Sequence, residues 1–456
     1  MKIAICSALL IAALGFASAA APASRAVTYG EVAAVLDVLR ADLLPPDLRT
    51  LSPADREAAW PGWVTRRDME IRRRLERGDE DSVVTLLLFG VTFTKQPRYS
   101  FAAWAGGKAP PGRAEEIVAA DPVVQMRARD LAAAMAAPSG NERLQFARGV
   151  IERNGLTLAT AEGRQEAERF LLDALRRMLA EYEEFFRERP AGATLFRQRG
   201  LASDTSIHAA FAIERALEDL AARKYLTRGQ VRRVAVVGPG LDFADKQEGL
   251  DVYPIQTIQP FAVIDSLRRL DLADPQVLRV AAYDLSPRVN RHLDAVVQAA
   301  RAGRTYTLHF PRNEAQPWTP EFVSYWERIG AWIGESTAPV PPIPALPAVR
   351  MRAVRLRPDV VQAVAAEDLN VVLQRPDLTS EERFDLVIAT NILIYYDVFE
   401  QSLALGNIAA ILRPGGLLLT NTPLFELPAV PMRLAGETPV VYMDGGRDWI
   451  MWYERQ

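Results

Sequence analysis

The chain has 456 residues, of which 49% are hydrophobic and 24% are charged, and its formal net charge at pH 7 is −3. This length predicts two folded units rather than one, and the composition is typical of a globular protein with a sizeable core. The weak negative charge excludes the strongly basic surface of a nucleic-acid-binding protein, so we predict no nucleic-acid partner, and we predict no metal site.

The first 20 residues have the three-part layout of a secretory signal peptide. Lys2 precedes an apolar run over residues 3–17, and Ala17-Ser18-Ala19 is a small-residue cleavage site. The apolar run is shorter than the roughly 20 residues that span a membrane. We therefore expect a periplasmic or secreted protein. The alternative is a protein that faces the cytoplasm and associates with the membrane through this segment.

Residues 27–230 are predicted to form an α-helical N-terminal domain. Apolar residues recur at helical spacing over 29–44, 165–187 and 206–225. Ser203-Asp204-Thr205 precedes the last of these helices and is predicted to cap it. Arg199 either reaches a site at the domain junction or hydrogen-bonds loop carbonyls. We expect this domain to cover a catalytic cleft or to recruit a substrate.

The second half, residues 231–456, begins with a pattern that predicts a nucleotide-type site. Residues 231–237 form an apolar strand, and Gly238-Pro239-Gly240 follows at once. A strand followed by Gly-x-Gly is the place where a doubly wound fold lets its backbone approach a nucleotide-like ligand. Asp242 and Asp245 come next, and they either contact such a ligand or cap the following turn.

An acid at the end of the second strand is a candidate ribose ligand. Residues 277–283 are predicted as this strand, which ends at Asp284. A carboxylate there offers two oxygens to the two hydroxyls of a ribose. The alternative is that Asp284 caps the next helix.

Two insertions are predicted in this half, at residues 241–259 and 309–348. The first leaves the sheet at the edge where ligands bind, so we expect it to be a lid or a substrate loop. The second contains an aromatic-rich segment and a proline-rich connector. Residues 305–310 and 349–356, at its two ends, are predicted strands.

The end of the chain predicts a βαβ unit followed by a hairpin. Residues 386–389 and 417–420 are buried strands that flank a helix over 399–412, which Pro414-Gly415-Gly416 is predicted to stop. Such a unit implies a parallel sheet. Residues 439–453 hold two apolar runs across a Gly-Gly turn, which predicts an antiparallel hairpin.

The stretch from Asn391 to Asp397, Asn-Ile-Leu-Ile-Tyr-Tyr-Asp, resembles the Asn-x-x-Ile-Tyr-Phe-Asp segment of the CheR-type methyltransferases, which act on glutamates of chemotaxis receptors. Together with the terminal hairpin, it makes residues 231–456 similar to class I S-adenosylmethionine (SAM)-dependent methyltransferases. The resemblance implies an α/β fold, a Rossmann-like class I methyltransferase sheet with a C-terminal antiparallel hairpin preceded by an all-α domain. It also implies SAM as the cofactor.

The resemblance further implies roles for individual residues. Asp284 would bind the ribose, Asp368 and Leu369 the adenine, and Asp242 the methionine amino group. Tyr395 and Asn391 would be catalytic, with the Tyr395 hydroxyl orienting an acceptor carboxylate or amide; the alternative for Tyr395 is packing under the adenine. The full set of predicted cofactor-binding residues is Gly238, Gly240, Asp242, Asp284, Asp368, Leu369 and Asn391.

The predicted function is methyl transfer from SAM to an O- or N-nucleophile, for which a carboxylate is one candidate, on an unidentified small-molecule or protein acceptor. One alternative is a non-catalytic SAM- or nucleotide-binding protein on a methyltransferase scaffold. The other is a dinucleotide-dependent oxidoreductase. Export would separate the protein from SAM, which is made in the cytoplasm.

Overall fold

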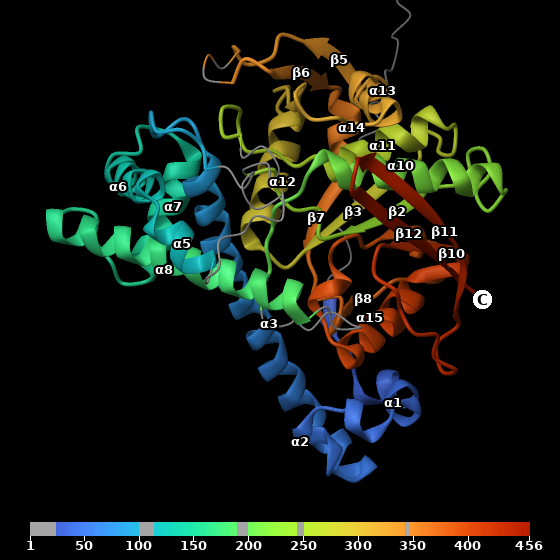
Figure 1. Cartoon of the computed structure of the whole chain (residues 1–456). Coiled ribbons are helices and arrows are strands. Elements are labelled where there is room, and N and C mark those ends of the chain that lie inside the picture. The colour runs from blue at the N-terminus through green and yellow to red at the C-terminus, as the bar shows by residue number, and fades with distance from the viewer. Residues whose placement is uncertain (1–23, 100–113, 189–198, 244–249, 343, 345) are drawn as a thin grey trace, which may run out of the picture.

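The computed structural model describes residues 24–99, 114–188, 199–243, 250–342, 344 and 346–456. A seven-stranded sheet lies at its centre, with helices on both faces (Figure 1). The strand order is β11-β12-β10-β9-β2-β3-β7. The strands are β2 (Arg233–Val237), β3 (Arg279–Asp284), β7 (Val364–Asp368), β9 (Phe384–Ile388), β10 (Leu412–Thr420), β11 (Met432–Met443) and β12 (Gly446–Arg455).

Five strands of this sheet are parallel, and β11 and β12 form an antiparallel hairpin at its edge. The predicted α/β fold with a C-terminal antiparallel hairpin is therefore confirmed. The chain runs from β2 outward through β3 to β7, and then returns to place β9 and β10 on the other side of β2. This reversal makes the carboxyl ends of β2 and β9 the topological switch point, where open α/β sheets bind their ligands.

Each face of the sheet belongs to its own hydrophobic core. Val234 and Val236 of β2 are buried in one core, and Ala235 and Val237 are buried in the other, as the two-residue period of a strand requires. The first core is covered by α10 (Ile207–Ala222), α11 (Gln259–Arg269), α12 (Pro287–Arg301) and α14 (Pro358–Gln362). The second is covered by α1 (Tyr29–Val38), the first half of α3 (Pro53–Phe89) and α15 (Val398–Ile411).

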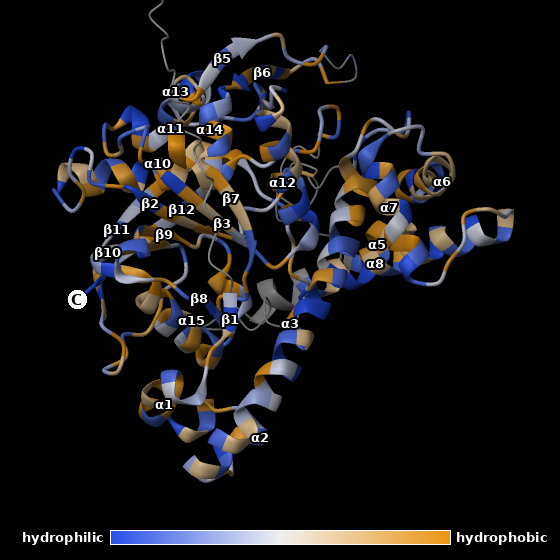
Figure 2. Ribbon diagram, turned by 180° about the vertical axis from the view of Figure 1, so that it is seen from behind, coloured by the Kyte–Doolittle hydropathy of each residue, from blue (hydrophilic) through white to orange (hydrophobic). Residues whose placement is uncertain are grey.

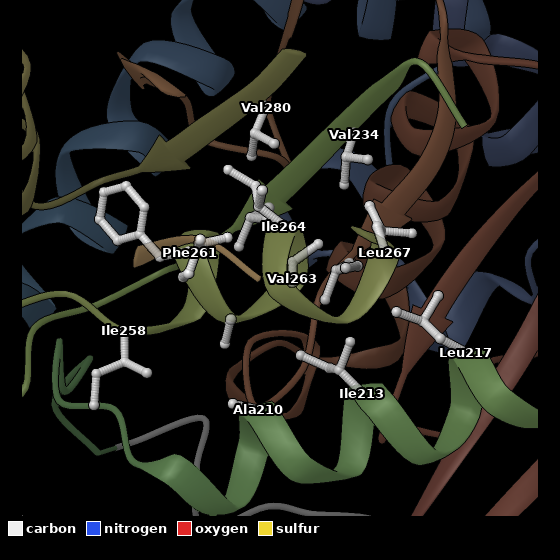
Figure 3. Close-up of a cluster of buried hydrophobic side chains, with 14 of the residues drawn as sticks. Ala210, Ile213, Leu217, Val234, Ile258, Phe261, Val263, Ile264, Leu267 and Val280 are labelled. Atoms are coloured by element: carbon white, nitrogen blue, oxygen red, sulfur yellow. The ribbon is translucent and has the colours of Figure 1, made fainter. Parts of the chain in front are cut away.

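Helix α10 packs with the sheet, although the sequence predicted it as part of the N-terminal helical domain. Figure 3 shows Ala210, Ile213 and Leu217 of α10 facing α11, which in turn packs on Val234 and Val280. The predicted domain boundary at residue 230 would therefore assign α10 to a different domain from the core in which it is buried.

The predicted cap of α10 is wrong. The N-cap residue is Ser206, which makes no side-chain cap hydrogen bond. The carboxylate of Asp204 instead accepts a hydrogen bond from Ser82 Oγ at 3.1 Å, so it ties the chain to α3.

A third core lies beside the sheet and is mostly helical, with Phe243 from the segment after β2 also buried in it. It is built from the second half of α3 and from α5 (Ala114–Ala120), α6 (Pro122–Ala136), α7 (Glu142–Arg153) and α8 (Ala161–Glu188). Figure 2 shows its apolar residues as a group separate from those around the sheet. Because α3 belongs to both groups, it joins this core to the sheet.

The predicted strands at the ends of the second insertion exist, but they pair with each other and not with the main sheet. β4 (Thr307–Asn313), β6 (Val349–Leu356) and β5 (Gly334–Thr337) form a three-stranded antiparallel sheet, next to α13 (Pro320–Arg328). The added unit therefore runs from residue 307 to residue 356, which is longer than the predicted 309–348.

Pro414-Gly415-Gly416 was predicted to stop the helix before it, but the helix ends earlier and these residues belong to a strand. α15 ends at Ile411, and these three residues lie inside β10, where the pairing with β9 shifts register between Leu412 and Leu417. The remaining short elements are β1 (Ser24–Ala26), η1 (Ala41–Leu43), α2 (Pro46–Arg49), β8 (Gln374–Pro376), η2 (Ser380–Glu382) and η3 (Leu393–Tyr395), with β1 and β8 paired.

Candidate functional site

A cavity of about 290 Å³ lies at the topological switch point. The carboxyl ends of four parallel strands line it, through Gly238 and Gly240 after β2, Asp284 at the end of β3, Leu369 after β7, and Asn391 and Tyr395 after β9. Six of the eight predicted site residues are thus brought together in one cavity. Asp242 and Asp368 do not line it.

The opposite wall of the cavity comes from the N-terminal half. It consists of Leu75 of α3, Ala209 of α10 and residues of the segment 199–206, which we call the strap. The strap crosses α3 at Gly78, where a Cβ would overlap the carbonyl oxygen of Leu201. The backbone N–H of Leu201 also donates to the carbonyl of Arg74. The expectation that the N-terminal half covers a cleft therefore agrees with the packing of the strap.

Three arginines of α3 fasten it to the rims of the cavity. Arg72 forms two hydrogen bonds with the Asp368 carboxylate, at 3.0 and 2.9 Å. Arg74 donates to the carbonyl of Tyr395 at 3.0 Å, and Arg67 forms an ion pair with the buried Glu400 at 2.8 Å. These contacts reach the end of β7, the segment after β9 and helix α15.

Both glycines of the predicted turn have left-handed backbones, with φ of 68° at Gly238 and 62° at Gly240. A Cβ at Gly238 would overlap the side chain of Ile392, and one at Gly240 would lie 2.5 Å from the carbonyl oxygen of Ser203. The absence of side chains at these positions therefore lets the strap and the β9 loop approach the turn. The turn also remains part of the cavity wall.

Asp284 is buried, with 7% of its surface exposed. Its carboxylate accepts hydrogen bonds from the backbone N–H groups of Ser286 at 2.7 Å and Gly240 at 3.3 Å. Burial raises the pKa of Asp284 to about 6 because it disfavours the charged form. The carboxylate thus caps the turn that precedes α12, and it also lines the cavity.

Asp242 belongs to the internal network of the first insertion. It accepts hydrogen bonds from Tyr253 Oη at 3.0 Å and from Gln256 Nε2 at 2.8 Å. Val91 and Thr92, which follow α3, donate from their backbone N–H groups to Asp251. Tyr253, Gln256 and Asp251 are all buried. The described part of 241–259 is therefore hydrogen-bonded to the N-terminal half, and residues 244–249, which include Asp245, lie outside the described residues.

Asp368 and Leu369 have different surroundings although they are adjacent. The side chain of Asp368 is 56% exposed and is paired with Arg72. Leu369 is buried and lines the cavity, as does Val371. Asp368 would have to leave Arg72 before it could reach a ligand.

Asn391 and Tyr395 both follow β9, where the methyl acceptor was expected. Asn391 has a φ of 59°, and its backbone N–H donates to Asn421 Oδ1 at 2.8 Å. Tyr395 is buried, and its carbonyl is held by Arg74. Arg199 lines the cavity, and its guanidinium lies 3.4 Å from Asp81.

The residues that line the cavity fit an adenosine-containing cofactor. On the side of β3 and β7 they combine a buried carboxylate, Asp284, with the apolar side chains of Leu285, Leu369 and Val371. On the side of β2 and β9 they include the polar side chains of Asn391 and Gln259, and the Gln259 side chain donates to Thr390 Oγ1 at 2.9 Å. An apolar wall with a few convergent polar groups is the usual form of a cofactor site.

Sequence reasoning gave Arg199 of the strap as a candidate for a site at the domain junction, but it missed the other strap residues, the arginines of α3 and the pair Asn421 and Asp448. Asn421 follows β10 directly, and an Asn at the carboxyl end of a parallel strand is a signal that could have identified it. No local sequence signal identified the α3 arginines, because they lie in a strongly charged stretch whose composition is equally typical of a solvent-exposed helix. Among the described residues, no helix is long and apolar enough to cross a membrane, and no three acidic, His or Cys side chains are grouped as a metal site.

Neither a protein-family model nor a curated protein matches the chain. Solved methyltransferase structures are similar to it at low identity. TrmN from Thermus thermophilus is 14% identical with a TM-score of 0.27, over 54% of this chain and 48% of that one. The mitomycin 7-O-methyltransferase MmcR is 12% identical with a TM-score of 0.28, over 89% of this chain and all of that one.

The glycopeptide N-methyltransferase MtfA is also 12% identical, with a TM-score of 0.21, over 53% of this chain and 73% of that one. The chain thus spans about half the length of TrmN. At these TM-scores the likenesses carry no inference about substrate, and the fold assignment rests on the strand order itself. A parallel sheet of β7, β3, β2, β9 and β10 that is continued by the antiparallel β12 and β11 is a class I methyltransferase fold.

Proposed function

We propose that the protein is a SAM-dependent methyltransferase that acts on an oxygen or nitrogen nucleophile, for which a carboxylate, as in the CheR-type enzymes, is one candidate. The observation that carries this proposal is the cavity at the switch point of the sheet. The ends of four parallel strands supply its wall, including the glycine turn after β2 and the buried Asp284 after β3.

SAM, when bound, supplies an electrophilic methyl group on a sulfonium. The residues of the chain would bind and orient the two reactants, because proximity and alignment contribute most of the rate in a direct displacement. Asp284 would accept hydrogen bonds from the ribose, and Leu369 would pack on the adenine. Asn391 and Tyr395 would contact the acceptor, because they follow β9 at the other end of the cavity.

The test is calorimetric binding of SAM and of S-adenosylhomocysteine to the full chain, followed by transfer of a labelled methyl group to extracts of the source cells. We expect binding of both compounds and a labelled product whose formation requires Asp284. Failure to bind either compound would exclude a SAM enzyme.

A second candidate is a non-catalytic binding protein on the same scaffold. The observation that favours it is the covered glycine turn, where Ile392 and the carbonyl of Ser203 occupy the space next to Gly238 and Gly240. Binding of S-adenosylhomocysteine without a methylated product in any fraction would support this candidate over the enzyme. A dinucleotide-dependent oxidoreductase is the weakest alternative.

The location of the protein remains a prediction, because residues 1–20 lie outside the described part of the chain. We propose export through this segment, with anchoring that leaves the fold facing the cytoplasm as the alternative. Only the alternative gives the fold direct access to cytoplasmic SAM.

A further inference from the structure

Three polar side chains form a hydrogen-bonded row beside the cavity. Asn391 follows β9, Asn421 follows β10, and Asp448 lies in β12. These three strands are neighbours in the sheet, so their side chains meet although 57 positions separate the first from the last (448 − 391).

The backbone determines which way each amide points. The N–H of Asn391 can only donate, so the atom of Asn421 that it meets at 2.8 Å is the carbonyl Oδ1. The NH2 group of Asn421 then lies 2.6 Å from the side chain of Asn391 and 3.3 Å from the Asp448 carboxylate. Because an NH2 group can only donate, the atom of Asn391 that faces it is Oδ1.

The NH2 group of Asn391 is therefore the free end of its side chain. Asn391 lines the cavity, and in the described part of the chain its hydrogen bonds use only its backbone N–H and Oδ1. The side chain thus offers two N–H donors to the cavity, while its Oδ1 already accepts from Asn421.

We propose, on the basis of the proposed function, that Asn421 and Asp448 are positioning residues which hold the Asn391 NH2 toward the methyl acceptor. The acceptor that fits this arrangement presents an oxygen lone pair, as a carboxylate does. A protonated amine would bring only N–H donors against those of Asn391, so the two groups could not hydrogen-bond to each other.

The chemistry of transfer agrees with this choice. Transfer to a carboxylate oxygen forms one C–O bond, breaks the donor C–S bond and releases no proton. Transfer to an ammonium group would require a base that first accepts a proton.

The test exchanges the side chains at positions 421 and 448. In the double variant Asn421→Asp with Asp448→Asn, the net charge is unchanged and the two side-chain hydrogen bonds can form with their direction reversed, while the Asn391 backbone N–H still donates to an oxygen at position 421. The new carboxylate at position 421 accepts from the Asn391 NH2, so the Asn391 amide turns and presents Oδ1 to the cavity. Acetate and methylammonium serve as probes, in the presence of S-adenosylhomocysteine, and asparagine side-chain amide signals are followed by NMR.

We expect the wild-type protein to bind acetate at least about tenfold more tightly than methylammonium, and the double variant to reverse this order. The net charge of −3 would by itself favour the cation, so a preference for acetate is not a bulk effect. A single Asn421→Leu variant should bind the two probes about equally, and it replaces the double variant if the latter fails to fold.

The proposal is overturned if wild type prefers methylammonium, if neither probe shifts the Asn391 amide, or if the exchanged variant keeps the acetate preference. S-adenosylhomocysteine binding is measured separately in the same samples. Its absence would refute the proposed function, whereas its presence without a probe preference would refute only this inference.

Discussion

At the scale of single residues, burial decides what a carboxylate can do. Asp284 and Asp368 end neighbouring strands, and both were predicted to bind the cofactor. Asp284 is buried against backbone N–H groups, which raises its pKa to about 6, whereas Asp368 is exposed and paired with Arg72. Of these two carboxylates, only Asp284 lines the cavity, so only its ionisation should change ligand binding directly.

Replacing Asp284 should weaken the binding of S-adenosylhomocysteine and abolish the pH dependence of that binding. Ribose hydroxyls donate to the ionised carboxylate, so binding favours the charged form and the affinity for S-adenosylhomocysteine should rise from pH 5 to pH 7. We expect Asp284→Asn to bind more weakly at pH 7 by about 1–3 kcal/mol and with little dependence on pH. Calorimetry at three pH values tests this, and an unchanged pH profile in the variant would show that another group is responsible.

Ionisation of Asp284 should strengthen ligand binding but reduce the stability of the folded protein. Its pKa is higher in the folded state, about 6, than in the unfolded state, about 3.9. Its contribution to folding is therefore fully present below pH 4 and is lost as pH rises through 6. The stability of Asp284→Asn relative to wild type should thus increase by about 1–3 kcal/mol between pH 4 and pH 7, as measured by denaturant unfolding without ligand. A constant difference would contradict the burial of a charged carboxylate.

At the scale of elements, the long helix α3 and the strap form one wall of the cavity. Gly78 of α3 is buried where the strap crosses it, and Gly62 lies in the same helix with only Arg66 Nη1 near the position of a Cβ, at 3.8 Å. The two glycines therefore allow the same substitution to be compared with and without contact to the strap.

Gly78→Ala should displace the strap, because its Cβ would overlap a backbone carbonyl that cannot rotate away. We expect a loss of about 1–3 kcal/mol of stability and at least about tenfold weaker binding of S-adenosylhomocysteine. Gly62→Ala is the control and should be neutral or stabilising by up to about 1 kcal/mol, since alanine favours helix. Equal effects of the two variants would show that the crossing does not shape the cavity.

At the scale of the whole molecule, ligand binding should slow hydrogen exchange on both sides of the cavity. The sheet supplies one wall and the N-terminal half supplies the other, while α5 to α8 pack in a core of their own. Hydrogen exchange with S-adenosylhomocysteine should therefore slow in residues 201–206 as well as in the turn after β2. Amides of α6 and α7 serve as the control and should not change; protection confined to the sheet loops would contradict the two-sided cavity.

The start of the mature protein is a second prediction at this scale. Because Ala17-Ser18-Ala19 has the form of a cleavage site, N-terminal sequencing should find a mature chain that begins near Ala20. An intact Met1 on protein that faces the cytoplasm would exclude export and would remove the conflict with SAM supply.

The sequence by itself determined the class of fold, most strands of the main sheet and the helices α1, α8, α10 and α15. β2, β3, β6, β9 and the β11–β12 hairpin were predicted within a few residues, except that the hairpin strands are longer. These signals are local, because a two-residue or 3.6-residue period and a glycine turn are present in a dozen consecutive residues. The same applies to the position of Gly238, Asp284 and Asn391 at strand ends, which the parallel order then brings together.

Only the tertiary structure decided what those residues contact. Arg72 and Asp368 are 296 positions apart, and Ser203 meets Gly240 only because the strap crosses the turn. The placement of α10 on the sheet and the row from Asn391 to Asp448 likewise depend on which elements become neighbours. A carboxylate or glycine has the same local pattern whether it binds a ligand or the protein itself, so the choice between these partners is made when distant segments pack.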